Sequence, residues 1–163
     1  MLRRKIYITG TIDEAAYLKF SKRLTVLEEQ DGSPIEIELY SFGGEAYSAL
    51  AFASRMRNSC CALHVRAHGL VASAAVLILA AGDDRRMAKE AWIMVHEDSG
   101  ELEGSVTMLE NAAVHARKLE LQWNSLLANL TGTPASKWQA LHEATTYLNA
   151  KECLALGLID RIL

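Results

Sequence analysis

The chain lacks the features that mark membrane, secreted and nucleic-acid-binding proteins. Its 163 residues carry a formal net charge of only −3 and contain no basic cluster. The longest apolar run, Leu70 to Ala81, is too short to cross a bilayer. The N-terminus lacks the order of basic, apolar and small residues that makes a secretion signal. We therefore expect neither a membrane nor a nucleic acid as a partner.

Cysteine is scarce as well. The three cysteines, Cys60, Cys61 and Cys153, are odd in number and lack the spacing of metal ligands. A disulfide framework is therefore not expected, and a reduced cytoplasmic location fits this usage best. The sequence predicts no metal site and no cofactor.

Apolar residues, in contrast, are plentiful enough for one core. Half of the residues are hydrophobic, and the length is that of a single domain. No linker or low-complexity tract divides the chain, so we expect one domain over residues 1–163. Strand-like alternation and helical periodicity follow one another repeatedly. This order predicts an α/β fold of repeated strand–helix units with parallel strands.

The expected elements can be placed by residue number. The strands are predicted over residues 5–9, 35–40, 62–67, 86–88 and 91–95. The earlier helices are predicted from a capping box at residues 11–14 to about residue 29, over 45–57, and over 73–81. A long helix then ends near residue 130 with Gly132 as its C-cap, and Thr133 and Pro134 open the next one as N-cap and first-turn proline.

Two segments carry groups that nucleophilic acyl transfer requires. Ser73 stands at the start of a small-residue helix, and His96 stands at the end of a later strand. Ser73 can attack a carbonyl only if a base takes its proton, and His96 is the best-placed base. The amide of Ala74, at the helix N-terminus, would stabilise an oxyanion. Taken alone, a serine in an alanine-rich helix more often serves close packing.

A second turn offers further amide groups. The strand over 35–40 runs into Ser41-Phe42-Gly43-Gly44, and a helix follows. A glycine pair between a strand and a helix lets N–H groups point at a ligand without interference from Cβ atoms. An ordinary turn is the commoner meaning of such a pair. Beside Ser73, the pair predicts an oxyanion hole built from Gly43, Gly44 and Ala74.

In order and over nearly the whole chain, these motifs resemble those of the Clp protease proteolytic subunit, a serine peptidase family. The matching segments are Ser41–Gly44 for the family's Ser-Pro-Gly-Gly, Gly69–Ala75 for its nucleophile segment, Met94–His96 for its Met-Ile-His, and Tyr147–Glu152 with Gly157–Asp160 for its C-terminal motifs. Four linked motifs in the family's order are far more specific than any one of them.

The resemblance implies both a fold and an assembly. The fold would be the α/β fold of the ClpP and crotonase type, with a projecting handle helix in a handle region of about residues 97–131. Ser73 would be the nucleophile and His96 the general base of a serine endopeptidase. Its substrates would be peptides or unfolded polypeptides, hydrolysed inside a homo-oligomeric chamber. A heptameric ring or a double ring is implied.

Three departures from the family pattern matter for mechanism. The family's third triad residue, an aspartate, falls on Thr145, and the proline of the turn motif is Phe42. The chain also begins almost at its first strand, so the family's axial segment is largely missing. That segment contacts the partner AAA+ ATPase, and its loss argues against dependence on such a partner.

The substitution at Thr145 leaves the third catalytic residue open. A threonine can hydrogen-bond an imidazole N–H but contributes no full charge, and losing the carboxylate of a working triad costs about four orders of magnitude in turnover. Glu143, two residues upstream, is one possible substitute. A Ser73–His96 dyad supported by Thr145 is equally plausible.

Two alternative functions remain beside the serine endopeptidase. The first is a catalytically weak or inactive scaffold subunit, suggested by Thr145 and the short N-terminus. The second is an acyl-CoA enzyme of the crotonase type, whose oxyanion hole also uses backbone amides. Of the other histidines, His64, His115 and His142 are interpreted as surface or packing residues. His68, close to the nucleophile segment, could line the site.

Overall fold

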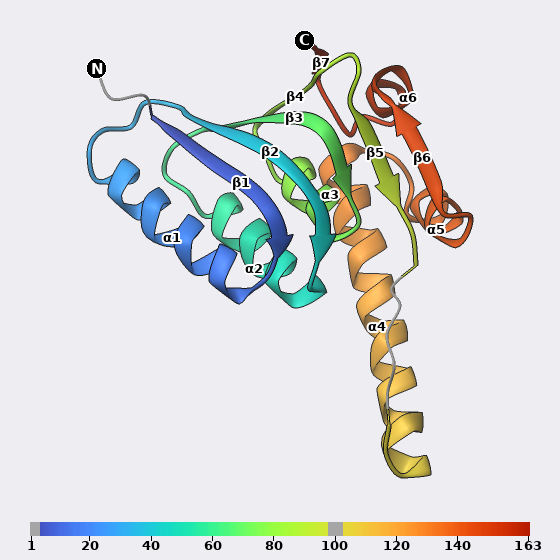
Figure 1. The fold of residues 1–163 in the computed structure, drawn as a ribbon. Helices are drawn as coiled ribbons and strands as arrows, with labels where there is room; N and C mark the ends of the chain where they lie inside the picture. The colour runs from blue at the N-terminus through green and yellow to red at the C-terminus, as the bar shows by residue number, and fades with distance from the viewer. Residues whose placement is uncertain (1–3, 98–102) are drawn as a thin grey trace.

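The computed structural model describes residues 4–97 and 103–163 (Figure 1). In chain order its elements are β1 (Lys5–Ile12), α1 (Glu14–Glu28), β2 (Ile35–Gly44), α2 (Ala46–Arg57), β3 (Leu63–Ala72), α3 (Ala74–Ala80), β4 (Asp84–Met87), β5 (Trp92–Val95), α4 (Val106–Thr131), α5 (Ala135–Glu143), β6 (Thr146–Asn149), α6 (Ala150–Ala155) and β7 (Arg161–Ile162). The predicted α/β class with repeated strand–helix units is confirmed.

The described strands form one sheet that forks along β3. Parallel pairing gives the order β1-β2-β3-β4-β7. The first half of β3, from His64 to Ala67, pairs with β4. Its second half, from Leu70 to Ala72, pairs in parallel with β5, which in turn pairs antiparallel with β6. The fork brings the end of β5 beside the end of β3.

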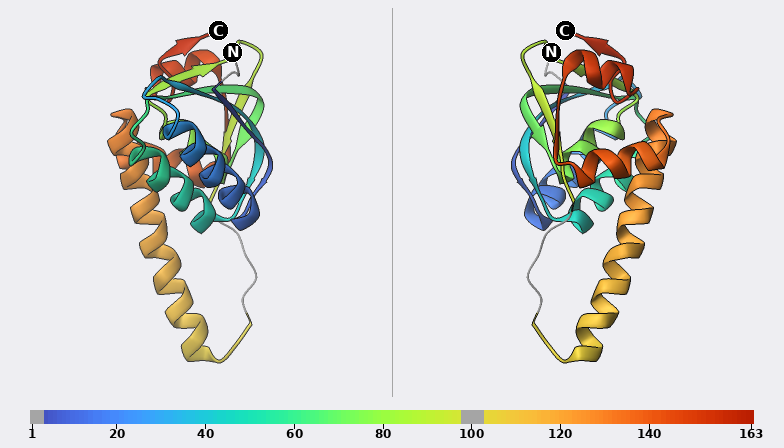
Figure 2. Two further views of the ribbon diagram at one scale, coloured as in Figure 1. Left: turned by 90° about the vertical axis from the view of Figure 1, so that its left-hand side faces the viewer. Right: turned by 90° about the vertical axis from the view of Figure 1, so that its right-hand side faces the viewer.

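Alternating side chains explain why the strands bury one face. Along β2, Ile35, Ile37 and Leu39 are buried, while Glu36 and Glu38 between them are partly exposed. The glutamates pair with Lys5 on β1 and Arg66 on β3 across the polar face of the sheet. Helices α1 and α2 lie on the apolar face (Figures 1 and 2). The period of two in the sequence therefore separates the core from the ion pairs.

Helix α3 lies at the centre of the core. All seven of its residues, Ala74 to Ala80, are buried. It contacts β2, β3, β5, α2 and α4. Its alanines let neighbouring segments approach closely, and its four larger side chains, Val76 to Leu79, fill the core around them. The turn that precedes this helix therefore rests on a helix that is buried along its whole length.

Helix α4 is the projecting handle that the sequence predicts. Its 26 residues extend well beyond the sheet (Figures 1 and 2), a length of about 39 Å at 1.5 Å per residue. Only Asn124 and Leu127 are fully buried, both in its C-terminal half. Residues 98–102 of the expected handle region, like residues 1–3, lie outside the described residues.

Two predicted caps are wrong, because Thr11 is part of a strand and the Thr133 hydroxyl bonds to another segment. Thr11 belongs to β1 and pairs with Gly43, so Asp13 caps α1 instead by accepting from the Ala16 N–H at 2.8 Å. The Thr133 hydroxyl donates to the Leu156 carbonyl at 2.7 Å, and the N-cap of α5 is Pro134. The C-cap at Gly132 is confirmed, with φ of 77° in the left-handed region.

The strands also extend past their predicted ends. Residues 35–40 continue to Gly44 and residues 62–67 continue to Ala72. A register shift between Leu39 and Ser41 accompanies the extension, and such bulges re-aim the chain near functional sites. As to membranes, no helix among residues 4–97 and 103–163 is long and apolar enough to cross one.

Two neighbouring glycines give a test of the packing around the end of α4. Gly132 and Gly157 both have positive φ, 77° and 65°, but a Cβ atom at Gly132 would meet nothing within 4 Å. A Cβ atom at Gly157 would lie 2.3 Å from the Thr131 carbonyl oxygen. We expect Gly132→Ala to lower the free energy of unfolding by about 1–2 kcal/mol through backbone strain alone. Gly157→Ala should lose at least about 1 kcal/mol more, because the contact adds overpacking.

Urea denaturation of both variants measures this difference. Equal decreases in the free energy of unfolding would show that the backbone around Thr131 moves to accommodate the added methyl group.

Candidate active site

Ser73 lies in the sharp turn between β3 and α3. Its backbone has φ of 53° and ψ of −126°, a conformation that residues other than glycine rarely adopt. Its N–H donates to the Met94 carbonyl of β5 at 2.8 Å. Such backbone strain costs about 1–3 kcal/mol and is typical of functional sites. The turn presents the Ser73 hydroxyl to a cavity at the N-terminus of α3.

His96 directly follows β5 and reaches this hydroxyl. Its Nε2 lies 2.9 Å from the Ser73 Oγ. The pairing of Ala72 with Met94 sets this distance, because it aligns the ends of β3 and β5. With Nε2 as the acceptor, the Ser73 hydroxyl donates, and Nδ1 carries the imidazole proton. The structure thus brings together the two residues that the sequence singles out for nucleophile and base.

The glycine turn at the end of β2 packs directly against Ser73. A Cβ atom at Gly43 would lie 2.7 Å from the Ser73 Cβ and 2.8 Å from the Ala72 carbonyl oxygen, so only glycine fits there. The Gly43 N–H donates to the buried Ser41 hydroxyl at 3.0 Å, and that hydroxyl donates to the Gly10 carbonyl at 2.5 Å.

Of the three residues predicted for the oxyanion hole, two line the cavity and one does not. Gly43 supports the turn and uses its N–H internally. Gly44 and Ala74 line the cavity beside Ser73. Ala74 is the first residue of α3, and the first N–H groups of a helix have no acceptor within it.

Thr145 lies next to His96 through the β5–β6 pairing. Val95 pairs with Thr146, which puts Thr145 opposite the position that follows Val95. Thr145 is exposed, has φ of 48°, and donates its N–H to the His142 carbonyl at 3.0 Å. Within residues 4–97 and 103–163, no carboxylate makes a hydrogen bond or ion pair with His96. Asp98, which also adjoins His96 in sequence, lies outside the described residues.

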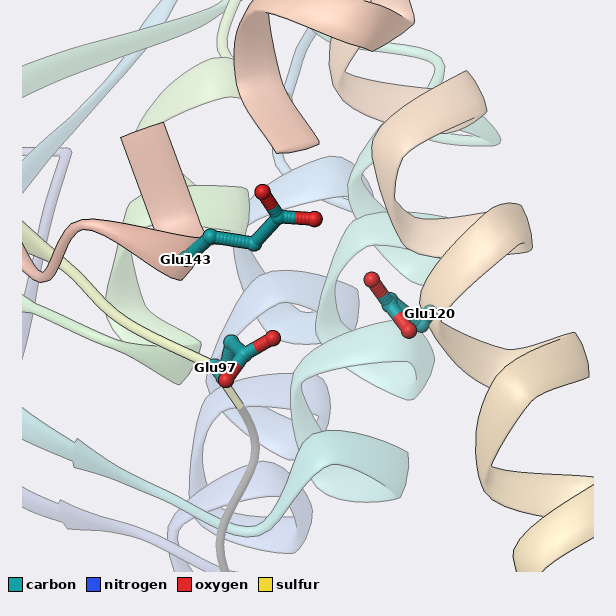
Figure 3. A group of neighbouring side chains, drawn as sticks. All are labelled: Glu97, Glu120 and Glu143. Carbon is teal, nitrogen blue, oxygen red and sulfur yellow. The ribbon is translucent and has the colours of Figure 1, made fainter. Parts of the chain in front are cut away.

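Glu143 is directed toward other groups. Its Oε1 accepts from Gln139 Nε2 at 2.8 Å. One carboxylate oxygen of Glu143 and one from each of Glu97 and Glu120 lie within 4.8 Å of one another (Figure 3). No local pattern in the sequence predicts this group, because its members are far apart in the chain.

His142 is a site residue that the sequence analysis missed. It is 8 % exposed, packs near Trp138, and lines the same cavity as Ser73 and His96. Burial lowers the pKa of His142, a hydrogen bond to the backbone of Trp138 opposes this, and the proximity of His96 lowers the pKa further. Its interpretation as a packing residue is correct but incomplete, since nothing local in the sequence indicates which surface α5 covers.

The other histidines lie away from the cavity. His68 Nε2 is 2.7 Å from Glu38 on the polar face of the sheet, so it does not line the site. His115 pairs with the Tyr47 hydroxyl at the surface.

The cavity combines polar chemistry with an apolar wall. Its lining consists of Gly44, Ala46, Ser73, Ala74, His96, Glu97, Ala116, Leu119, Glu120, Trp123, Asn124 and His142. Helix α4 contributes the apolar wall through Ala116, Leu119 and Trp123. A hydroxyl with an adjacent imidazole, helix-terminal amides and a hydrophobic wall suit attack on the carbonyl of a bound chain.

Comparison with known proteins gives a consistent result. The family model described as Clp protease matches residues 1–163. The chain is 31 % identical over 162 residues to the ATP-dependent Clp protease proteolytic subunit 2 of Treponema denticola, covering 98 % of this chain and 81 % of that protein. The structure is similar to that of a mutant of ClpP1 from Listeria monocytogenes, with a TM-score of 0.90, 23 % identity, and coverage of 98 % of this chain and 91 % of that one.

The structural likeness supports the fold, and the sequence matches support the family. Membership also weakens the crotonase-type alternative, which rested on a shared fold and on backbone amides alone. The chain belongs to the Clp protease family.

Proposed function

We propose that this chain is a serine endopeptidase in which Ser73 is the nucleophile and His96 the general base. The observation that carries the proposal is the 2.9 Å contact between Ser73 Oγ and His96 Nε2. The strained backbone of Ser73 and its place at a helix N-terminus give independent support. Family membership supports the same reaction class.

The proposed reaction proceeds by acyl transfer. As the Ser73 oxygen bonds to the scissile carbonyl carbon, His96 Nε2 takes the hydroxyl proton. The N–H groups of Ala74 and Gly44 stabilise the negative charge on the carbonyl oxygen. When the peptide C–N bond breaks, the imidazolium returns its proton to the leaving amine. Water then attacks the acyl-enzyme with His96 again as the base, and Ser73 recovers its proton.

His142 has a supporting electrostatic role in this proposal. The same surroundings that lower its pKa keep it uncharged near neutral pH. A second cation in the cavity would repel the imidazolium that His96 becomes during the reaction. A buried, neutral His142 therefore lets the positive charge form on His96 without this penalty.

The proposed substrate is an extended peptide in an oligomeric chamber. Main-chain hydrogen bonds beside the site would hold such a peptide as an added strand. The chamber would be a homo-oligomeric ring, heptameric or doubled, in which other copies cover exposed apolar residues of the handle. These residues include Val106, Met108, Leu109, Val114 and Leu121. We further propose a cytoplasmic location.

An AAA+ ATPase is the candidate partner for folded substrates. The Treponema relative is named as a subunit of an ATP-dependent protease. Hydrolysis of a peptide that is already unfolded requires no unfolding step, so it would proceed without this partner.

A scaffold subunit is the second candidate function. No carboxylate of the described residues makes a hydrogen bond or an ion pair with His96, and the family's aspartate position holds Thr145. A subunit without a carboxylate partner for its histidine would assemble but hydrolyse peptides slowly or not at all. Chemical labelling of the serine separates the two candidates.

A fluorophosphonate probe should label the assembled protein once per chain. We expect the adduct in intact-mass spectra to disappear in Ser73→Ala and to fall at least tenfold in rate in His96→Ala, because the base activates the hydroxyl. Ser125→Ala removes an exposed serine of α4 and is the matched control. Full labelling of Ser73→Ala would refute the assignment, and no labelling of the native chain would favour the scaffold.

Replacing the threonine opposite His96 should raise activity. In Thr145→Asp, we expect kcat for peptide hydrolysis to rise at least tenfold, since a carboxylate would orient the imidazole and stabilise the imidazolium. Aspartate also tolerates the positive φ at this position. Thr145→Asn has a similar shape without the charge, so steady-state kinetics of both variants isolate the charge. Equal gains in the two variants would contradict the electrostatic explanation.

The buried state of His142 predicts a pH dependence of stability. Its folded pKa is lowered below the ordinary value of 6.5, so the unfolded chain binds more protons in this range. The native state should therefore lose stability as pH falls through about 6.5 toward the lower folded pKa. Urea denaturation at pH 7.5 and 5.5 measures the free energy of unfolding. Between these pH values, this free energy should fall less in His142→Gln than in the native chain. An unchanged loss would contradict the prediction, and His115→Gln controls for removing a histidine from the surface.

A further inference from the structure

Strand β1 leaves one of its edges without a partner strand. Among residues 4–97 and 103–163, β1 pairs with β2 alone and ends the order of the sheet. The Arg4 carbonyl accepts from the Glu36 N–H at 2.9 Å, toward β2. Main-chain groups that face one neighbour alternate along a strand with groups that face the other side, so those of Lys5, Tyr7 and Thr9 face away from β2. An edge of this kind can pair with a further chain.

A groove lies between residues 5–9 of β1 and helix α1, which runs beside β1 in Figure 1. Its other wall is the part of α1 between Ala16 and Val26. No described residue of β2 or α2 lines the groove, so it opens on the side away from β2. Both walls are about 15 Å long, at about 3.3 Å per strand residue and 1.5 Å per helix residue. An extended segment of about five residues fits this length.

The groove combines a buried apolar floor with exposed apolar side chains. Phe20 and Ile8 are buried in its lining, whereas Tyr7 is 67 % exposed and Val26 is 47 % exposed. Tyr7 alternates along β1 with the buried Ile6 and Ile8, so its side chain lies on the opposite face of the strand. A strand added to β1 would therefore cover Tyr7 on one face and meet α1 on the other.

The rim of the groove on α1 is basic. Lys19, Lys22 and Arg23 line it, and no aspartate or glutamate of the described residues does. Lys19 and Lys22 are exposed, and none of the three forms an ion pair within the described part of the chain. The fourth basic residue of the lining, Lys5, pairs with Glu38 on the polar face of the sheet. In a chain of net charge −3, this local positive charge favours an acidic partner.

We propose that this groove is a docking site for an extended segment of another protein whose residues alternate between acidic and apolar. The segment adds a strand to β1 through main-chain hydrogen bonds to Lys5, Tyr7 and Thr9. Its acidic side chains face α1 and contact Lys19 and Lys22, and its apolar side chains cover Tyr7. Main-chain pairing supplies affinity, and the alternation of side chains supplies specificity.

A second copy of this chain does not suit the groove. Pairing of two β1 edges would bring two basic rims together, and like charges repel. The chain's own segment of alternating acidic and apolar residues, 35–39, already forms part of β2. There Glu36 pairs with Arg66 and Glu38 pairs with Lys5. The partner is therefore a different protein.

The docking site would hold this partner away from the proposed catalytic pair. Strand β2 lies between β1 and β3, and the groove shares no described lining residue with the cavity of Ser73 and His96. A bound segment is therefore tethered without being presented to Ser73, a consequence that rests on the proposed function. The docking itself uses no residue of that cavity, so it can be tested separately.

Binding is tested on the full-length chain carrying Ser73→Ala, so that a peptide probe is not hydrolysed. The probe is a fluorescein-labelled hexapeptide of alternating glutamate and valine, and fluorescence anisotropy measures its binding. Of two matched probes, one carries lysine in place of every glutamate, and the other carries a methyl group on every amide nitrogen. The first reverses the charge of the probe, and the second removes its main-chain donors.

Charge-reversal variants locate the binding site. Lys19→Glu and Lys22→Glu change the rim of the groove, and Lys137→Glu changes an exposed residue of α5 outside it. Circular dichroism verifies that each variant is folded.

We expect one glutamate–valine probe to bind per chain, with saturation below about 1 mM. Lys19→Glu and Lys22→Glu should each weaken binding at least about threefold, and Lys137→Glu should leave it within about twofold of the parent. The lysine probe and the N-methylated probe should both bind at least about tenfold more weakly than the glutamate–valine probe.

Absence of saturation up to about 1 mM would overturn the proposal. Equal binding of the N-methylated probe would do the same, because it excludes strand pairing, and so would an equal loss in Lys137→Glu, because it indicates unspecific charge attraction. If a second copy of the chain fills the groove, Lys19→Glu will change the sedimentation coefficient of the protein without any probe, and the proposal is then wrong.

Discussion

One backbone hydrogen bond, from the Ser73 N–H to the Met94 carbonyl, fixes the relation between the proposed nucleophile and its base. It extends the pairing of β3 with β5 by one residue past Ala72. Because the bond lies in the sheet and next to the fully buried helix α3, neither partner can shift without disturbing the core. The contact between the Ser73 and His96 side chains depends on this backbone alignment.

Space for the strained turn at Ser73 comes from the neighbouring glycine. Any side chain at Gly43 would collide with the Ser73 Cβ and the Ala72 carbonyl. The buried Ser41 hydroxyl holds the glycine turn in place through bonds to Gly43 and Gly10. This arrangement links β1, β2 and β3 at one end of the sheet. Local strain at Ser73 is thus maintained by close packing over three strands, as expected for a preorganised site.

The handle helix α4 forms both the projecting part of the molecule and one wall of the cavity. Its exposed N-terminal part projects from the body (Figure 1), while its C-terminal half walls the cavity through Leu119 and Trp123. Movement of this one helix would therefore change both the projecting surface and the cavity. Glu97 and Glu120, the two carboxylates of the described cavity lining, lie close to Glu143 at this junction.

Patterns in the amino-acid sequence are sufficient to predict the α/β class, the strand–helix order, the helix end at Gly132, and Ser73 and His96 as candidate nucleophile and base. Each of these rests on local periodicity, on a cap or on a short motif. Three features are visible only in the folded chain: β3 pairs with both β4 and β5, His142 lines the cavity, and three glutamates from distant segments converge. The structure also replaces the caps expected at Thr11, which pairs within the sheet, and at Thr133, whose hydroxyl donates to the Leu156 carbonyl. These outcomes depend on contacts between residues far apart in the chain, which no local pattern encodes.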